Sequence, residues 1–513
     1  MNLSAGDQFF ESKYLIRFRI EKSCLLWARR FSRKINVPDE NTYQDEIRRF
    51  LELFFFVLLK DFFFFFFLNR NLNKFIFFCG LVFVSVRKVP KWIRLIAGFF
   101  FRKIHFVGRK ELDLALSKPL KRGFIFVPSD GCTGDRNKFL TDLTSSRQPV
   151  IGVYESSGEV KQLAELEAMG IPHHRINQSC RVPLATIFHL SARYLCKNCS
   201  VIGFIGFFGY IFFEVTFRQW LKFFAEIGYG GIFWDPGEGS LISYARNVAA
   251  NKYGLTTCSK VRSYPSNNPW LKFYNYDYLC CYNDDAVKKF TNINRKLNLR
   301  RVTLGENMGS KVVHDFFEEK RLRYNHILVL IDNAFSSNKG FEQVIPERSY
   351  SVFLEDLCGR IDSLEDCCLL LKSKRKGCYP STFSLSNFRN VFEIPFEYGS
   401  SIGPYAKNVD LMIGIGVFYP SLMMEGLAVG LRGVYVDLTG SAVADAVNEN
   451  FYKPNLFFRS SRDFFEALGC ELSTKFGGEL GDWSKYPSLQ GDVLQNMDCD
   501  SYAEFLARQI NIS

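Results

Sequence analysis

From residue 123 onward, short apolar runs alternate with amphipathic stretches, a pattern that predicts parallel strands separated by helices. A first series starts at residues 123–128, and a second starts at residues 326–332, HILVLID. The remaining strands are expected at residues 149–154, 171–176, 231–234, 256–261, 276–281, 301–304, 368–372, 391–395, 410–415 and 434–437. The predicted fold class is therefore α/β with two Rossmann-like lobes, residues 123–322 and 323–513. Ligands are expected where the carboxyl ends of the strands meet.

Residues 1–122 follow a different pattern and predict a helical, Phe-rich region at a membrane surface. Residues 51–68 carry charged side chains, and residues 75–86 are apolar but only twelve long, whereas a spanning helix needs about 20 apolar residues. Basic residues flank 75–86 and Trp92 follows, which favours a segment lying in the lipid headgroup layer. The alternative is that these phenylalanines form the core of an N-terminal helical bundle.

The excess positive charge lies entirely in this front region. Residues 1–122 hold 24 Lys and Arg against 11 Asp and Glu, whereas the other 391 residues hold 41 against 42. Nucleic-acid sites interleave basic residues with single aromatics rather than with blocks such as residues 62–67. The charge therefore predicts an anionic membrane surface as a partner, and no nucleic acid.

Residues 201–213 are apolar with glycines at 203, 206 and 209, a spacing that places a flat stripe on one helical face. The segment is too short to span a bilayer alone. We favour a close-packed helix beneath the sheet over a second segment that touches the membrane.

The most informative stretch is residues 409–440, which predicts a strand, a sharp turn, a helix and a second strand. The first strand leads into Gly416. Pro420 has no backbone N–H, but it can occupy the first turn of a helix because the N–H groups there have no partner within the helix. Ser421 can cap that turn or bind an anion at the positive helix end. Glu425, one turn further, can accept a hydrogen bond from a ribose hydroxyl. The unit is typical of a nucleotide site, or of a buried strand–helix–strand unit in another doubly wound protein.

These residues resemble the C-terminal half of GT-B glycosyltransferases, and more narrowly a bacterial polysaccharide-biosynthesis family named for a Pro-Phe-Thr-Ser motif. The matching positions hold Phe418-Tyr419-Pro420-Ser421, followed by Tyr435 and Asp437, so the tetrapeptide itself is not reproduced. The likeness extends from about residue 123 to the C-terminus. It implies a nucleotide-sugar donor bound by the second lobe, with lysines at a strand end of that lobe, which points to Lys374.

Two further groups of polar residues follow predicted strands. Lys372 and Lys374 alternate onto one face and can place ammonium groups on phosphate, although solvated loop charge explains them equally. Asn333 follows the first strand of the second lobe. An inverting transfer also needs one general base in the first lobe. The candidates, each with a turn or cap role as its alternative, are Glu155, Asp235 and Glu238.

Several other chemistries lack their motifs. The chain has no phosphate loop ending in Gly-Lys-Ser/Thr and no His-Glu-x-x-His helix, and Gly414-Ile-Gly416 lacks the third glycine of a dinucleotide fingerprint. Fifteen cysteines without a secretion signal favour a reducing compartment, and Cys196 and Cys199 have no second pair at zinc spacing. We therefore expect no metal ion and no cofactor beyond the nucleotide-sugar co-substrate.

The residues and the resemblance together predict a glycosyltransferase-like enzyme of surface polysaccharide biosynthesis. It moves a sugar from a nucleotide donor to a glycan or lipid-linked acceptor by inversion and without a metal ion. It is expected at the cytoplasmic side of the inner membrane, as a peripheral or monotopic protein. Two alternatives stay open: a nucleotide-sugar epimerase of GT-B form, and a non-catalytic membrane-bound assembly subunit.

Overall fold

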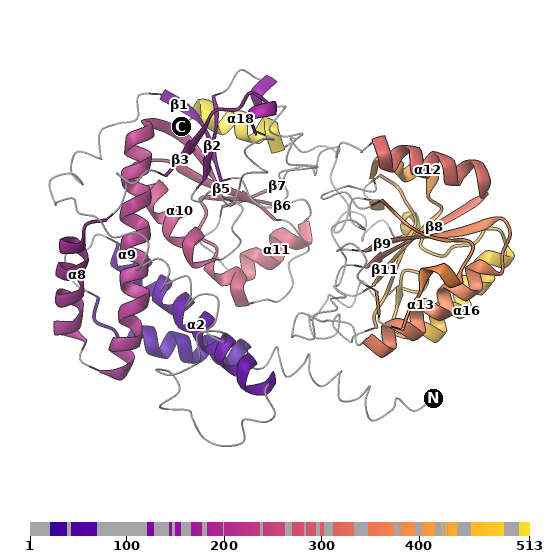
Figure 1. Cartoon of the computed structure of the whole chain (residues 1–513), viewed down its shortest axis with the longest axis horizontal. Helices are drawn as coiled ribbons and strands as arrows, with labels where there is room; N and C mark the ends of the chain where they lie inside the picture. Colours follow the sequence, from indigo (N-terminus) through magenta and orange to yellow (C-terminus); the bar gives the residue numbers. More distant parts are fainter. Residues whose placement is uncertain are drawn as a thin grey trace.

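A computed structural model gives the fold (Figure 1). It describes residues 21–37, 43–68, 121–127, 143–145, 149–154, 166–176, 182–198, 200–235, 240–261, 269–281, 284–293, 298–301, 311–332, 347–373, 379–380, 382–395, 403–415, 423, 426–427, 429–438, 453–486 and 502–512. These residues form two lobes, each built on a parallel sheet.

In the first lobe, the described strands form a seven-stranded parallel sheet with the order β3-β2-β1-β4-β5-β6-β7. The strands are β1 (Lys121–Phe126), β2 (Val150–Tyr154), β3 (His173–Arg175), β4 (Tyr229–Trp234), β5 (Thr256–Lys260), β6 (Tyr278–Cys281) and β7 (Asn298–Arg301). The strand order reverses between β1 and β4, and their carboxyl ends are level because Phe126 pairs with Trp234.

In the second lobe, the described strands form a six-stranded parallel sheet with the order β10-β9-β8-β11-β12-β13. The strands are β8 (His326–Asp332), β9 (Cys367–Ser373), β10 (Val391–Glu393), β11 (Leu411–Ile415), β12 (Gly433–Val436) and β13 (Phe457–Phe458). The order reverses between β8 and β11. Two doubly wound parallel sheets confirm the predicted α/β fold class with two Rossmann-like lobes.

Helices cover both faces of each sheet, as the alternation of apolar side chains requires. In the first lobe, Ile125 faces α9 and α10, whereas Phe124 and Phe126 face the opposite side. In the second lobe, Leu328 and Leu330 face α13 and α16, and Val329 faces α12. The helices are α2 (Gln44–Leu68), α8 (Leu184–Lys197), α9 (Val201–Ile227), α10 (Leu241–Tyr253), α11 (Asp284–Ile293), α12 (Lys311–Arg323), α13 (Glu347–Asp362), α16 (Ser461–Ser473) and α18 (Tyr502–Ile512). Short 3-10 helices are η3 (Pro269–Phe273), η4 (Leu385–Asn387), η5 (Gly403–Asn408) and η7 (Trp483–Lys485).

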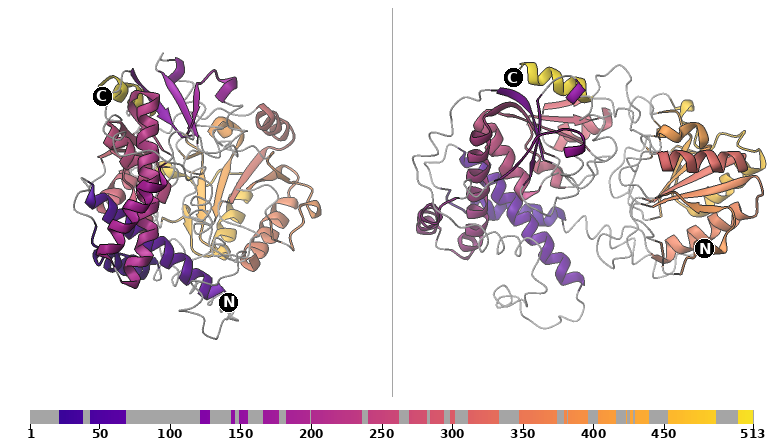
Figure 2. Two further views of the ribbon diagram at one scale, coloured as in Figure 1. Left: turned by 60° about the vertical axis from the view of Figure 1, so that its left-hand side comes forward. Right: turned by 45° about the horizontal axis from the view of Figure 1, so that its top comes forward.

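The last helix returns to the first lobe. In both views of Figure 2, α18 lies beside the first sheet. Its side chains Phe505, Leu506 and Ile510 are buried with Phe124 and Trp234 on the face opposite α9. The sequence-based division placed residues 502–512 in the second lobe, and the structure differs because their apolar side chains pack on the face of β1 and β4 opposite α9.

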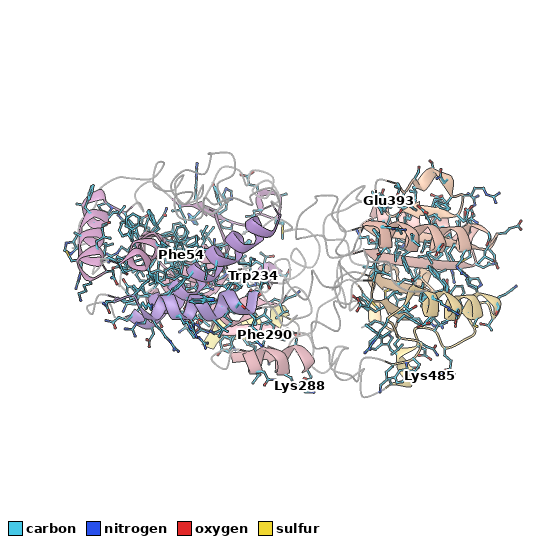
Figure 3. The ribbon with its side chains drawn as sticks, turned by 90° about the horizontal axis from the view of Figure 1, so that it is seen from below. Phe54, Trp234, Lys288, Phe290, Glu393 and Lys485 are labelled. Carbon is cyan, nitrogen blue, oxygen red and sulfur yellow. The ribbon has the colours of Figure 1, made fainter. Side chains whose placement is uncertain are left out.

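The N-terminal phenylalanines divide into two groups. Phe50, Phe54, Phe55 and Phe56 of α2 are buried in the core of the first lobe, and Figure 3 shows Phe54 in its interior. These four side chains therefore have a core position and not a membrane contact, and the core is that of the first lobe instead of a separate N-terminal bundle. The side chains of residues 61–68 and all of residues 75–86 lie outside the described residues. Among the described helices, none is long and apolar enough to cross a membrane.

The glycine stripe of α9 is a packing surface. A Cβ added at Gly209 would lie 2.7 Å from Phe54 Cδ1 and 3.1 Å from Leu51 Cδ2 of α2, and one at Gly206 would overlap Ile35. α9 runs on to Ile227 because its later turns are apolar and pair Glu214 with Arg218 at 2.9 Å. The predicted close-packed helix is confirmed.

Gly209→Leu should therefore destabilise the first lobe by about 1–3 kcal/mol, because the new side chain forces α2 away from α9. Urea unfolding monitored by circular dichroism measures the change. Gly359→Ala in α13, where a Cβ meets nothing within 4 Å, is the control and should leave stability equal or slightly higher. An unchanged midpoint for Gly209→Leu would contradict this account of the α2–α9 contact.

Candidate functional site

The candidate site lies at the carboxyl edge of the second sheet, where three strands end level. Asp332 at the end of β8 pairs with Ile415 of β11 on one side and with Ser373 of β9 on the other. The loops that follow these strands consequently start next to one another. Because the strand order reverses between β8 and β11, this is the position at which doubly wound sheets bind ligands.

Three of the seven predicted donor-binding residues follow these strand ends directly. Asn333, Lys374 and Gly416 are the next residues after β8, β9 and β11, so the register starts their three loops at one edge. Their own structure lies outside the described residues, as does that of Pro420, Ser421 and Glu425.

Lys372 is described and lies within β9. It is half-buried, and by alternation it shares the face of Cys368 and Leu370, which is the face that α12 covers. Lys372 thus lies close to the strand end, on the α12 side of the sheet.

The helix between β11 and β12 is fixed at its C-terminal end. Met423 and Leu427 are buried against β12, where they approach Gly433. Gly430, with φ +87°, closes the helix: its N–H donates to Leu427 O at 3.0 Å, and Leu431 N–H donates to Gly426 O at 3.0 Å. These two hydrogen bonds together form a Schellman motif, which ends a helix at a left-handed glycine. The two strands and the end of the helix in the predicted unit are therefore present, and the turn and the start of the helix lie outside the described residues.

The structure adds Asp437 to this edge. Its backbone N–H donates to Phe458 O at 2.8 Å, and its side chain is buried directly after β12. Tyr435, by contrast, stacks on Phe457 with ring centroids 5.4 Å apart and belongs to the core. The position immediately after a buried strand was the available sequence signal for Asp437.

In the first lobe, Asp235 has a different role from the predicted one. Its carboxylate accepts two hydrogen bonds from the Arg246 guanidinium, at 2.8 and 2.9 Å, and one from Ser243 Oγ at 2.9 Å. The side chain is wholly buried, and Arg246 in turn lies 5.2 Å above the Trp220 ring. This carboxylate fixes the start of α10 to the end of β4 and is closed to an acceptor hydroxyl, so its prediction as general base is corrected.

The other two base candidates, Glu155 and Glu238, lie outside the described residues. Glu155 directly follows β2, and the loop that contains Glu238 follows β4, so both loops start at the carboxyl edge of the first sheet. Trp234, which ends β4, lies inside the first lobe (Figure 3).

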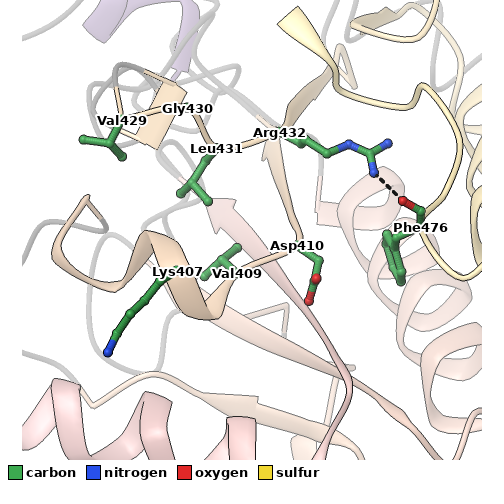
Figure 4. A pocket seen from close by; sticks show the side chains of 8 residues that line it. All are labelled: Lys407, Val409, Asp410, Val429, Gly430, Leu431, Arg432 and Phe476. Carbon is green, nitrogen blue, oxygen red and sulfur yellow. Dashed lines mark hydrogen bonds between the residues drawn. The ribbon is translucent and has the colours of Figure 1, made fainter. Parts of the chain in front are cut away.

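A depression of about 550 Å³ lies at the opposite, amino edge of the second sheet (Figure 4). Its lining includes Asp410 and Arg432, which precede β11 and β12. Asp410 accepts from Arg321 Nη1 at 2.9 Å and from Ile327 N–H at 2.8 Å, and Arg432 donates to Phe476 O at 2.9 Å. These polar groups hold the lobe together, and we do not place the donor site there.

Metal ligands do not cluster among the described residues: no group of three His, Cys, Asp or Glu side chains there could hold an ion. Burial raises the pKa of the Cys281, Cys358 and Cys368 thiols to about 12, so they stay protonated.

Two short motifs escaped the sequence interpretation. Gly399-Ser-Ser-Ile-Gly403 has nucleophile-elbow spacing but leads into the 3-10 helix η5, and an Asp-x-Asp pair at residues 498–500 lies outside the described residues.

Comparisons with known proteins give structural likenesses only. No family model and no curated protein matches the chain. A glycosyltransferase from Rickettsia africae matches with a TM-score of 0.42 and 12% identity, covering 77% of this chain and 98% of its own. Anabaena HepE in complex with UDP and glucose matches with a TM-score of 0.42 and 10% identity, covering 76% of this chain and 98% of its own. Arabidopsis thaliana UGT89C1 complexed with UDP matches with a TM-score of 0.46 and 9% identity, covering 76% of this chain and 100% of its own. Likeness at this level identifies no activity, so the functional argument rests on the chain's own residues.

Proposed function

We propose that this protein transfers a sugar from a nucleotide-sugar donor to a glycan or lipid-linked acceptor in surface polysaccharide biosynthesis. The observation that supports it is the level carboxyl edge of β8, β9 and β11 at the reversal of strand order, from which the loops of the predicted donor residues start. The proposed setting is the cytoplasmic face of the inner membrane.

In this proposal the helix after β11 binds the donor at its N-terminus. In this proposal, backbone N–H groups of the first turn and the Ser421 hydroxyl bind phosphate, where a helix dipole favours negative charge. Lys374 adds a charge-assisted contact from the neighbouring strand end. Glu425 accepts from the ribose, and Asn333 and Gly416 line the same edge.

The reaction proposed is a direct, inverting displacement at the anomeric carbon, without a metal ion. The acceptor hydroxyl attacks, its proton passes to a carboxylate of the first lobe, and the nucleoside mono- or diphosphate leaves with the electrons of the broken glycosyl–oxygen bond. Since Asp235 is bound by Arg246, Glu155 and Glu238 are the remaining base candidates.

Glu425→Ala and Lys374→Ala should each lower sugar transfer by roughly 10- to 100-fold, because each removes one charged hydrogen bond to the donor. Incorporation of radiolabelled sugar into a membrane extract containing the acceptor measures this. Lys407→Ala, 68% exposed at the opposite edge of the sheet, is the matched control and should retain full activity.

Product analysis without acceptor separates the alternatives. A rearranged nucleotide sugar formed without any acceptor would identify an epimerase. Full transfer by the Glu425→Ala, Lys374→Ala double variant would refute the donor-site assignment.

A further inference from the structure

Residues 21–33 form a helix whose rotation is fixed by contacts with the first lobe. Cys24 is fully buried, and Phe31 packs edge-on against Phe55 of α2 with ring centroids 5.6 Å apart. Just beyond the helix, Asn36 N–H donates to Asn198 Oδ1 at 2.8 Å, and Asn198 Nδ2 donates to Asn36 O at 3.0 Å. The side of the helix that points away from the lobe is thereby defined.

That outer side combines basic and large apolar residues. At about 100° per residue, the exposed positions of residues 21–34 fall within one arc of about 140°. We call this surface the basic face: it consists of Lys22, Leu26, Trp27, Arg30, Arg33 and Lys34, with Ser23 among them. Leu26 and Trp27 are 56% and 47% exposed, although both are large and apolar. The only acidic residue of this segment, Glu21, is buried on the other side.

We propose that the basic face docks onto a bilayer surface that contains anionic phospholipid. The four cations of the basic face, which has no exposed anion within residues 21–34, attract lipid phosphates, and the leucine and tryptophan side chains lose their water contact on entering the headgroup layer. Arg30 lies 5.2 Å above the Trp27 ring, so the indole and a phosphate-binding guanidinium reach the interface together. A partner that bound through charge alone would leave Leu26 exposed to water.

Docking at this face has a consequence for the first lobe. The helix is packed on α2, and Ile35 beyond it contacts α9 at Gly206, so the lobe follows the helix to the membrane. This inference goes beyond the sugar-transfer proposal and stands independently of it. It also assigns membrane contact to residues other than 75–86.

Vesicle co-sedimentation of the full chain tests the docking. Wild-type protein should bind vesicles of phosphatidylcholine mixed with phosphatidylglycerol, and bind phosphatidylcholine vesicles much less. Arg30→Ala with Arg33→Ala should weaken binding roughly 25-fold, because each basic residue near an anionic surface contributes about fivefold. Leu26→Ser should weaken it as well. Leu322→Ser, 90% exposed in α12, is the matched control and should bind like the wild type.

Fluorescence quenching by brominated lipid gives a second readout that does not depend on folding defects. Part of the wild-type quenching should disappear in Trp27→Phe, whose melting curve should match that of the wild type. Absent binding, equal binding to neutral vesicles, or wild-type binding by the Arg30→Ala, Arg33→Ala variant would each overturn the inference. These outcomes bear on the membrane setting but not on the transfer reaction, which is tested separately by nucleotide binding and by sugar incorporation.

Discussion

Asp235→Ala is expected to lower the stability of the first lobe by about 3–5 kcal/mol. The substitution leaves the Arg246 guanidinium buried without its carboxylate, and Ser243 loses its acceptor. Removing one partner of a buried ion pair costs this much because the remaining charge is uncompensated. Urea unfolding followed by tryptophan fluorescence is a suitable measurement, since Trp220 lies beneath Arg246.

A double variant separates this structural role from a catalytic one. Asp235→Leu combined with Arg246→Met should recover much of the stability, because no buried charge remains. Asp356→Ala, an exposed carboxylate of α13, should leave stability unchanged. A stable but inactive Asp235→Ala enzyme would contradict our assignment and restore Asp235 as a base.

The second large effect is expected for Arg432→Met in the second lobe. Arg432 donates to Glu471 Oε1 at 2.7 Å, to Leu480 O at 2.9 Å and to Phe476 O at 2.9 Å. Glu471 is almost fully buried, so the variant leaves a buried carboxylate and two carbonyls short of their donor. We expect a loss of about 3 kcal/mol in the stability of the second lobe.

Thermal unfolding of Arg432→Met beside Arg462→Met checks this expectation. Arg462 pairs with Glu466 on the exposed surface of α16, where solvent screens the pair, so its removal should leave the midpoint unchanged. Equal midpoints for the two variants would show that the Arg432 network contributes nothing to stability.

The central strands were predictable from sequence because they are apolar on both faces, whereas the polar strand β7 lies at residues 298–301 instead of the predicted 301–304, and β13 was not predicted. The run at residues 326–332 coincides with β8, and the run at 410–415 differs from β11 by one residue. Gly209 was predictable as a contact surface because helical spacing places the glycines on one face. Local pattern determines these features, so no long-range information was needed.

Features that depend on long-range partners were not predictable. The burial of Asp235 depends on Arg246 in the following helix, and the sequence around Asp235 is equally suited to a loop base. The apolar residues of α18 predict a buried helix but do not say which sheet receives it. For the candidate site, the sequence predicted only which residues follow the strand ends. The strand register then places the starts of these loops side by side, but the contacts with a ligand depend on the conformations of the loop side chains.

Calorimetric titration of the full chain with UDP, GDP, CDP and CMP tests the central claim most directly. The account predicts saturable binding of one of these nucleotides, in EDTA as well as in Mg²⁺, weakened by Glu425→Ala and unchanged by Lys407→Ala. A requirement for Mg²⁺ would contradict metal-free donor binding. Absence of binding by all four would contradict the nucleotide-sugar assignment and favour a non-catalytic assembly subunit.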